Sequence, residues 1–236
     1  MVVDLLAIAA HPDDVEQTCG GTLLRAAEAG YRTGVIDLTA GEMGSRGTPE
    51  TRLEEARAAA GILKLAQRGN MRFPDTKLIN WVEYREKLAL EIRSLQPRTV
   101  ILPYWEARHP DHYHAAAIGF DACFLAGLRK LDPTTEPARP FNVIYSAMYA
   151  NVTPTFVVDI TREFDRRMES LFAYQSQYGA RDEATGLFPE AAEIRDRLAG
   201  IARFYGNLIG TKYGEPFVVK ETMRIDDVMS LGVRSF

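Results

Sequence analysis

The sequence predicts an α/β fold, in which helices cover both faces of a doubly wound, mostly parallel β-sheet. Val2–Ala10 is an unbroken apolar run, which is typical of a strand buried on both faces of a parallel sheet. Strand-like and helix-like segments then alternate four times up to about residue 128. With 236 residues and 46% hydrophobic composition, the chain can bury one substantial core. We therefore expect a single Rossmann-like domain over residues 1–236.

The individual elements follow from local patterns. The first helix is expected over Thr22–Ala29 and stops at Gly30, a favourable residue after a helix end. Thr48 is the expected N-cap of the next helix, with Pro49 in its first position. Further strands are expected at Thr33–Leu38, Arg68–Phe73, Thr99–Leu102, Asn142–Met148 and Phe156–Ile160. The helix that begins at Pro49 is expected to run through Arg52–Leu63, and further helices are expected at Val82–Leu95, Ala115–Leu128, Arg162–Gln175 and Ala191–Phe204. Gly206–Val219, rich in glycine and tyrosine, is expected to be a loop.

Composition excludes several classes of function. The net charge is −4 and no basic stripe is present, which argues against a nucleic-acid partner. Cys19 and Cys123 lie far apart and outside any CxxC pair, so we expect two reduced packing thiols. The apolar N-terminus is too short for a signal peptide, and no run approaches the ~18 apolar residues of a membrane span. The expected location is the cytoplasm, away from membranes.

The histidines identify the region where chemistry is expected. All four lie in two segments, Ala10–Asp14 and Arg108–His114, and each segment follows the carboxyl end of a predicted strand. In a doubly wound sheet of order 3-2-1-4-5 the first and fourth strands are neighbours, and the strand order reverses between them. Open α/β sheets bind their ligands in the crevice at that point. The two segments are therefore predicted to meet there.

Their residue types indicate a catalytic metal ion. Asp13, Asp14 and Asp111 would share one crevice, and clustered carboxylates need a compensating cation. Imidazoles and carboxylates are the usual ligands of zinc and related ions, and a site of two histidines and one carboxylate leaves a position open for water. His11 and Asp14 can converge on the ion. Asp13 must then diverge from its neighbour and suits a general base.

The second segment leaves alternatives open. His112 and His114 would be turned roughly 200° from each other on a helix, so only one should face the metal. Asp111 could cap that helix and also hold the tautomer of His109. His109 would then stabilise the oxyanion and give a proton to the leaving amine. Spacing alone does not decide which of these histidines is the ligand.

The segments AHPDD and HPDH, together with Gly20-Gly21 and Thr39–Gly44, resemble the LmbE-like (PIG-L) family of zinc-dependent N-acetylglucosaminyl deacetylases. Within it, the sequence is most similar to the deacetylases of bacillithiol biosynthesis, from Val2 to about Pro216. The resemblance implies hydrolysis of an N-acetyl amide, most specifically that of N-acetylglucosaminyl malate, with one Zn²⁺ per chain. It also implies a homo-oligomer, often a hexamer.

Carried over by position, the resemblance also implies roles for particular residues. The implied zinc ligands are His11, Asp14 and His112; the implied catalytic residues are Asp13 as base, His109 as acid and Asp111 as its orienting partner. Arg52 is similar to the arginine that contacts the anionic group of malate-bearing substrates, and Arg108 and Glu42 are substrate-side candidates. Some members also use a mobile tyrosine, for which Tyr205 and Tyr213 are the candidates here.

Other hypotheses are separable from this one. The substrate could be another N-acetyl sugar, a chitobiose-type sugar or a thiol conjugate. The chain could instead be a nucleotide- or sugar-binding module without chemistry, or a scaffold subunit, although Gly20-Gly21 lacks the GxGxxG spacing of dinucleotide sites. Structural alternatives are a turn role for Asp13 and a solvated helix face for Arg52. His114 is expected to be an ordinary helix residue.

Overall fold

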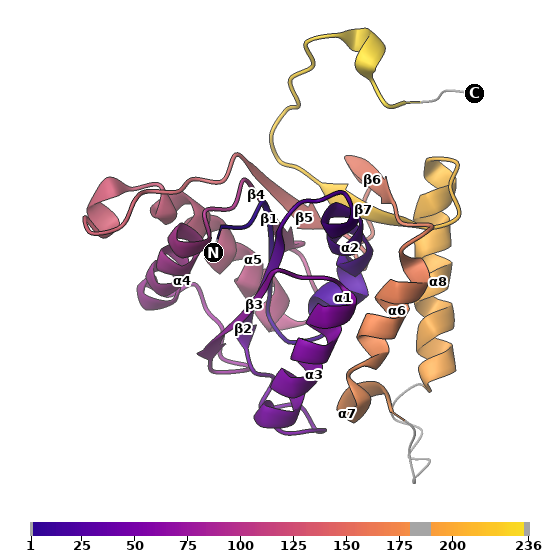
Figure 1. Cartoon of the computed structure of the whole chain (residues 1–236), viewed down its shortest axis with the longest axis horizontal. Coiled ribbons are helices and arrows are strands. Elements are labelled where there is room, and N and C mark those ends of the chain that lie inside the picture. The colour runs from indigo at the N-terminus through magenta and orange to yellow at the C-terminus, as the bar shows by residue number, and fades with distance from the viewer. Residues whose placement is uncertain (1, 180–189, 234–236) are drawn as a thin grey trace.

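The computed structural model describes residues 2–179 and 190–233, whose strands form one seven-stranded sheet of order β3-β2-β1-β4-β5-β7-β6 (Figure 1). The strands are β1 Leu5–Ala9, β2 Thr33–Thr39, β3 Gln67–Phe73, β4 Thr99–Pro103, β5 Asn142–Ser146, β6 Phe156–Asp159 and β7 Gly214–Val218. The helices are α1 Asp14–Thr18, α2 Gly20–Glu28, α3 Pro49–Ile62, α4 Val82–Leu95, α5 Pro110–Ala126, α6 Phe164–Phe172, α7 Gln175–Tyr178 and α8 Ala191–Leu208. Short 3₁₀ turns lie at Arg129–Leu131 and Val228–Ser230.

The first five strands confirm the predicted doubly wound arrangement. β1 pairs in parallel with both β2 and β4, and β3 and β5 extend the sheet in parallel on either side. The strand order therefore reverses between β1 and β4. Polar segments that follow these two strands leave the sheet at the same edge.

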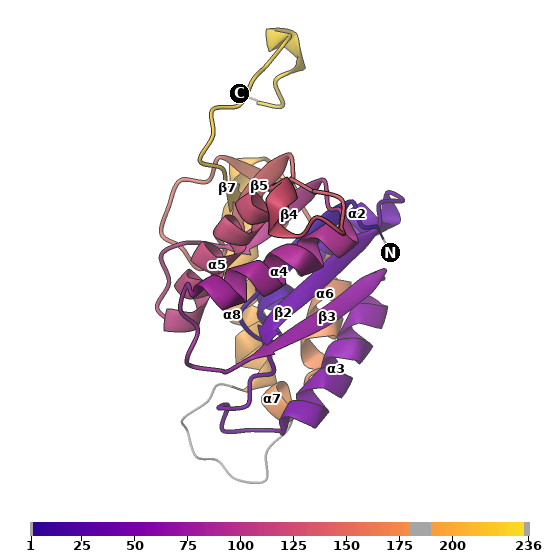
Figure 2. The same cartoon turned by 90° about the vertical axis from the view of Figure 1, so that its left-hand side faces the viewer.

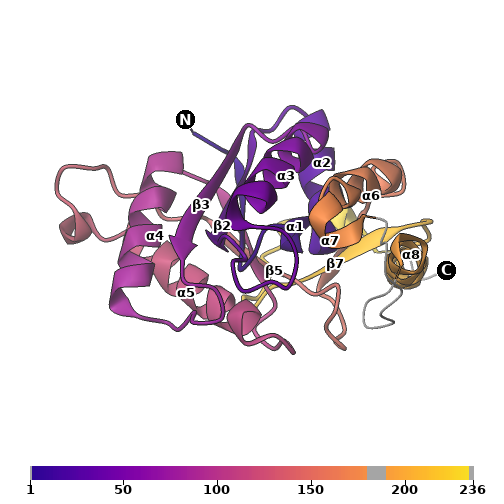
Figure 3. The same ribbon diagram turned by 90° about the horizontal axis from the view of Figure 1, so that it is seen from below.

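Alternating side chains of the central strands divide the core between the two faces of the sheet. Leu6 and Ile8 of β1 belong to the cluster that packs under α4 and α5, whereas Ala7 and Ala9 pack with Val15 and the α2 side. Figure 3 shows α4 and α5 on one side of the sheet and α1, α2, α3 and α6 on the other. Both faces are covered, which explains the continuous apolar run of β1.

The expected loop over Gly206–Val219 is wrong in its second half, because Gly214–Val218 forms β7 between β5 and β6. β7 runs antiparallel to both neighbours. Pro216 lowers the strand signal because it lacks an N–H, but its carbonyl still accepts a hydrogen bond from Ala147. Gly214 is required sterically, since a Cβ there would lie 2.5 Å from Val157.

The helical segment expected over Arg162–Gln175 is divided into α6 and α7. Tyr174, between them, has a ψ of 71° and is fully buried against Ala56 and Ala59 of α3. Because of this break, the short helix α7 packs against α3. Helix α7 thereby lies near the edge of the sheet at which β1 and β4 end. A second helix missed by the sequence analysis, α1, begins directly after Asp13.

The C-terminal residues after β7 leave the body of the protein. Figures 1 and 2 show this arm extending away from the sheet and its helices. Its apolar side chains are largely exposed, among them Val228, Met229 and Val233 at 69%, 86% and 74%. No helix in the described residues has the length and hydropathy of a membrane span.

Candidate functional site

The two histidine segments meet at the carboxyl ends of β1 and β4, as the topology predicts. The imidazole centroids of His11 and His112 lie 5.4 Å apart, and that of His109 lies about as close, 4.9 Å from His11 and 5.0 Å from His112. His109 is the N-cap of α5, so His112 sits in its first turn. The 17-residue helix thus fixes the second segment against the first.

His11, Asp14 and His112 form a trio that could hold a metal ion. Their ligand atoms all lie within 4.8 Å of one another. Asp14 Oδ1 is 3.2 Å from His112 Nε2, and Asp14 Oδ2 is 3.5 Å from His11 Nδ1. Asp14 Oδ2 also accepts the backbone N–H of His11, which closes the turn around Pro12. The trio therefore combines two imidazoles with one carboxylate that lies between them.

Asp13 faces the opposite way from its neighbour. Its backbone has a φ of 94°, in the left-handed region, which a non-glycine residue adopts at a cost of about 1–3 kcal/mol. Its carboxylate accepts a hydrogen bond from Arg52 Nη2 at 3.3 Å and from the Tyr178 hydroxyl at 2.6 Å. The adjacent carboxylates thus point into two different environments, as their adjacency predicts.

A second trio contains the remaining catalytic candidates, His109 and Asp111, together with His11. Here the structure differs from the expected contacts. Asp111 does not cap α5; the cap is the Nδ1 atom of His109, which accepts the backbone N–H of Asp111 at 3.2 Å. The Asp111 carboxylate accepts from His11 Nε2 at 3.3 Å and from the backbone N–H of Thr76 at 2.7 Å, so its side-chain partner is His11 rather than His109.

Asp75 is a site residue that the sequence analysis missed. Its carboxylate lies 3.0 Å from His11 Nε2 and accepts the backbone N–H of Met43 at 2.9 Å. It is buried, and it follows the carboxyl end of β3 by two residues. That position was the available signal, because β3 ends at the same edge of the sheet as β1 and β4.

Tyr178 was also missed, and the two expected tyrosines lie elsewhere. The Tyr205 hydroxyl donates to the carbonyl of Ala150, and the Tyr213 ring stacks on Phe164 at 3.9 Å, both within the cluster under α8. These partners, Ala150 and Phe164, lie outside the two histidine segments. No sequence signal near Tyr178 indicated its contact with Asp13, which lies 165 residues earlier.

The substrate-side candidates take different positions. Arg52 is only 5% exposed, so the solvated-face alternative is wrong; it donates to the carbonyls of Pro12 and Gly41 besides Asp13. Glu42 accepts the backbone N–H of Asp75 at 2.7 Å and so supports that loop. Arg108 is exposed beside His109. His114 packs its ring against Tyr113 and belongs to neither trio.

The electrostatics of the site favour a bound cation. Burial disfavours protonated His11, but hydrogen bonds to Asp111, Asp14 and Asp75 outweigh it and raise its pKa to about 12. Burial alone would raise the pKa of Asp14, yet His112 and His11 hold it well below its usual value. The carboxylates around His11 and His112 therefore stabilise positive charge at these imidazoles, and a bound metal ion would supply that charge.

The residues present fit a divalent metal ion. His11 Nε2 is directed at Asp75 and Asp111, which leaves Nδ1 toward Asp14; metal-binding imidazoles are typically held by a carboxylate in this way. Asp111 Oδ1 is buried and has no hydrogen-bond partner among the described residues, so this carboxylate has unused capacity. Two imidazoles and one carboxylate suit zinc, iron or manganese.

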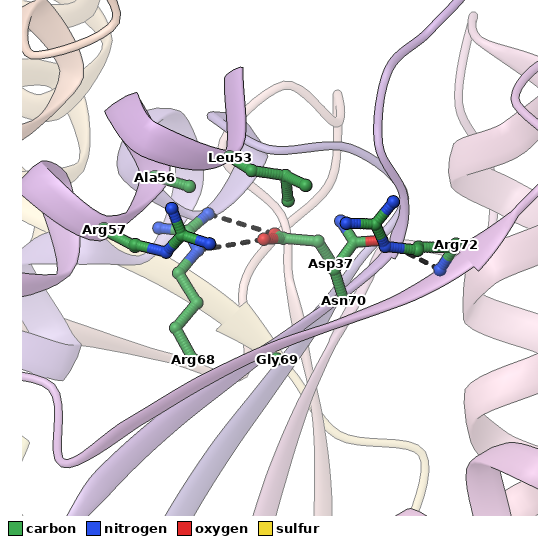
Figure 4. Close-up of a pocket in the computed structure, with 8 residues that line it drawn as sticks. All are labelled: Asp37, Leu53, Ala56, Arg57, Arg68, Gly69, Asn70 and Arg72. Atoms are coloured by element: carbon green, nitrogen blue, oxygen red, sulfur yellow. Dashed lines mark hydrogen bonds and ion pairs between the residues drawn. The ribbon is translucent and has the colours of Figure 1, made fainter. Parts of the chain in front are cut away.

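A separate cavity of about 220 Å³ lies between α3 and the edge strand β3 (Figure 4). Arg68 lines it and donates to both oxygens of Asp37 at 2.9 and 3.0 Å and to Glu16 at 2.5 Å. Glu16 and Asp37 are almost fully buried. This ion network joins α1 to β2 and β3, and we interpret it as structural support for the loop that carries Asp13 and Asp14.

Comparison with known proteins agrees with this geometry. Residues 6–123, half of the chain, match the family described as GlcNAc-PI de-N-acetylase (PIG-L). This range contains both histidine segments. The chain is 29% identical to the diacetylchitobiose deacetylase of Thermococcus kodakarensis, over 91% of this chain and 82% of that protein.

Two further relatives cover most of the chain. The probable N-acetyl-alpha-D-glucosaminyl L-malate deacetylase 2 of Bacillus anthracis is 28% identical over 75% of this chain and 82% of that protein. The crystal structure of the conserved protein TT1542 from Thermus thermophilus superposes with a TM-score of 0.85 at 39% identity, covering 95% of this chain and 98% of that one. On its sequence match, its fold and the arrangement of its two histidine segments, the chain belongs to the PIG-L (LmbE-like) family.

Proposed function

We propose that this protein is a metal-dependent deacetylase that hydrolyses the N-acetyl amide of an N-acetylglucosamine-containing compound. The single observation that carries the proposal is the opposite orientation of Asp13 and Asp14. Asp14 lies between two imidazoles that could share a metal ion with it. The neighbouring carboxylate of Asp13 does not contact these imidazoles and contacts Tyr178 instead. This is the arrangement that a metal-assisted hydrolase needs.

In the proposed reaction His11, Asp14 and His112 would hold the ion, which would supply Lewis acidity towards a water molecule and the acetyl carbonyl. Asp13 takes a proton from the attacking water. Its burial raises the pKa to about 7, against the lowering effect of Arg52, so the carboxyl can accept a proton near neutral pH. Asp75 and Asp111 hold His11 in the tautomer whose Nδ1 is free.

His109 is assigned to the oxygen that becomes negatively charged. Because its Nδ1 accepts the N–H of Asp111, the neutral ring carries its proton on Nε2, which has no hydrogen-bond partner among the described residues and can donate. Removing such a donor typically costs roughly 3–4 kcal/mol of transition-state stabilisation. As the C–N bond breaks, the leaving nitrogen takes up the proton that Asp13 accepted from the water. His109 acts as the acid only when Nδ1 also carries a proton, which costs its contact with the Asp111 N–H. The products are acetate and a free sugar amine.

We propose two specific substrates for the first tests. N-acetylglucosaminyl malate, the compound of bacillithiol biosynthesis, is supported by the sequence resemblance and by the Bacillus anthracis relative. Diacetylchitobiose is supported by the relative that matches 91% of the chain. Buried Arg52 makes three hydrogen bonds within the protein, so recognition of malate would fall to other groups, of which exposed Arg108 is the nearest candidate in sequence to His109.

The test is acetate release from N-acetylglucosamine, diacetylchitobiose and N-acetylglucosaminyl malate at matched concentrations. Protein is stripped with a chelator and reloaded with zinc, iron or manganese in parallel. We expect release from at least one sugar, lost on chelation and restored by metal. If metal-loaded protein released no acetate from any of these sugars, the result would contradict the proposal and favour a non-catalytic binding module.

We also propose that the chain forms a homo-oligomer, with a hexamer as the expected size. The support is the family resemblance and the exposed apolar side chains of the C-terminal arm, since large apolar groups in an extended arm favour burial against another surface. Light scattering after size exclusion, on the full chain and on a variant that ends after Val219, measures this. A full-length monomer would contradict it.

A further inference from the structure

Both oxygens of Asp13 are held by side chains from elements that follow it in sequence. The Tyr178 hydroxyl of α7 donates to Oδ2 at 2.6 Å, and Arg52 of α3 donates to Oδ1 at 3.3 Å. Each carboxylate oxygen has two lone pairs, so a further proton can still be accepted. The two hydrogen bonds thus fix the rotation of the Asp13 carboxylate and still leave it able to accept a proton.

The short helix α7 that carries Tyr178 is fastened to its surroundings by side-chain hydrogen bonds. Glu55 of α3 accepts from the Ser176 backbone N–H at 2.6 Å and from its hydroxyl at 2.7 Å. Gln177 Nε2 donates to the carbonyl of Arg46 at 2.8 Å, and Arg46 donates back to the carbonyl of Gln177 at 2.9 Å. A helix of only four residues has little stability of its own, so these contacts define its place.

The loop before α3 is shaped to receive α7. Gly47 has a φ of 68°, and a Cβ at this position would lie 2.7 Å from the Ser176 hydroxyl. Glu55 lies three residues after Arg52, almost one turn along the same helix. One helix therefore sets the positions of both groups that bond Asp13, one directly and the other through α7.

We propose that Tyr178 is a positioning residue for Asp13 and that the Glu55–Ser176 contact holds it in place. This inference rests on the proposed function, because it assumes that Asp13 is the base. Tyr178 acts through its hydroxyl: the ring packs against Phe172, and phenylalanine would fill the same volume. Losing the hydroxyl would let the carboxylate rotate away from the attacking water, which lowers the rate of the chemical step more than substrate affinity.

The first experiment compares kcat and KM for Tyr178→Phe with wild type, using the sugar that wild type hydrolyses best. We expect kcat to fall roughly tenfold to a hundredfold, the usual worth of a hydrogen bond to a charged group, with KM within about twofold. Tyr205→Phe is the matched control, since it removes another hydrogen-bonded hydroxyl away from the site. An unchanged kcat, or a rise in KM alone, would overturn the positioning role.

The second experiment tests the fastening. Ser176→Ala removes one bond to Glu55 and should lower kcat less than Tyr178→Phe, in the same direction. In the Tyr178→Phe background it should have no further effect on kcat, because the group that it positions is gone. Effects on kcat that multiply in the double variant would contradict the fastening role.

The third experiment does not depend on activity. Urea unfolding midpoints are measured for Tyr178→Phe in wild type and in Asp13→Gly, where glycine tolerates the positive φ. We expect a downward shift of the midpoint in wild type and none in Asp13→Gly. Equal shifts would show that the two residues are not coupled and would overturn the inference. If wild type hydrolyses no sugar, the proposed function fails, while this cycle still reports the Tyr178–Asp13 bond.

Discussion

Asp13 and Asp14 are neighbours in sequence, yet they belong to two contrasting flanks of one site. On the imidazole flank, Asp14 contacts His11 and His112, and the pKa of its carboxyl is held well below the usual value. On the helix flank, made by α3 and α7, burial raises the pKa of Asp13 to about 7. The left-handed backbone at Asp13 separates the two side chains. The difference teaches that one short turn can place a metal ligand and a base side by side without giving both the same affinity for protons or metal.

The strongest test of this comparison is removal of the imidazole flank. His11→Ala deletes one ring of the trio and leaves Asp75 and Asp111 without their shared partner. We expect no bound metal by elemental analysis and no acetate release above that of chelator-treated wild type. A variant that keeps a full equivalent of metal would show that the ion is held elsewhere.

Removal of the base on the helix flank should separate activity from metal binding. Asp13→Asn keeps the shape of the side chain, and asparagine tolerates a positive φ. We expect turnover to fall about 10²–10⁴-fold, the usual contribution of general base catalysis, while metal content stays at the wild-type level. Metal lost together with turnover would mean that the two flanks do not divide the work as proposed.

A smaller effect is expected from the residue that supports the imidazole flank. Asp75→Asn replaces a carboxylate 3.0 Å from His11 Nε2 by an amide. Such supporting partners typically contribute about 10–100-fold in metal affinity or activity. Competition with a chromophoric chelator measures the affinity. Asp121→Asn, which changes a carboxylate of α5 paired with Arg85 of α4, is a control that should leave it unchanged. An unchanged affinity in Asp75→Asn would leave Asp75 outside the site.

The smallest effect distinguishes two roles for Arg52. Arg52→Lys keeps the charge but loses the forked contacts with Asp13, Pro12 and Gly41. If Arg52 serves Asp13, kcat should fall about tenfold for sugars with and without malate alike. A rise in KM confined to N-acetylglucosaminyl malate would instead support the anion-binding role that the sequence resemblance implies.

Much of the fold could be predicted from sequence because the first five strands carry local signals. Buried parallel strands have apolar runs, and helix starts such as Thr48-Pro49 bear their own cap; Thr48 indeed accepts the N–H of Thr51. β7 could not be predicted, because Gly214 and Pro216 weaken the strand pattern and only pairing with β5 and β6 makes it a strand. Its carboxylate Glu215 is fully buried, where it accepts the N–H groups of Gly21 and Thr22.

The amino-acid sequence by itself determined which strand ends carry the histidines and carboxylates. It hence determined that the segments Ala10–Asp14 and Arg108–His114 meet, because parallel strands deliver the segments that follow them to one edge. Only the tertiary structure decided which side chains surround those residues. Asp75 reaches His11 from the loop after β3, and Arg52 and Tyr178 reach Asp13 from α3 and α7. Such contacts depend on how loops and helices pack on the sheet rather than on any local pattern.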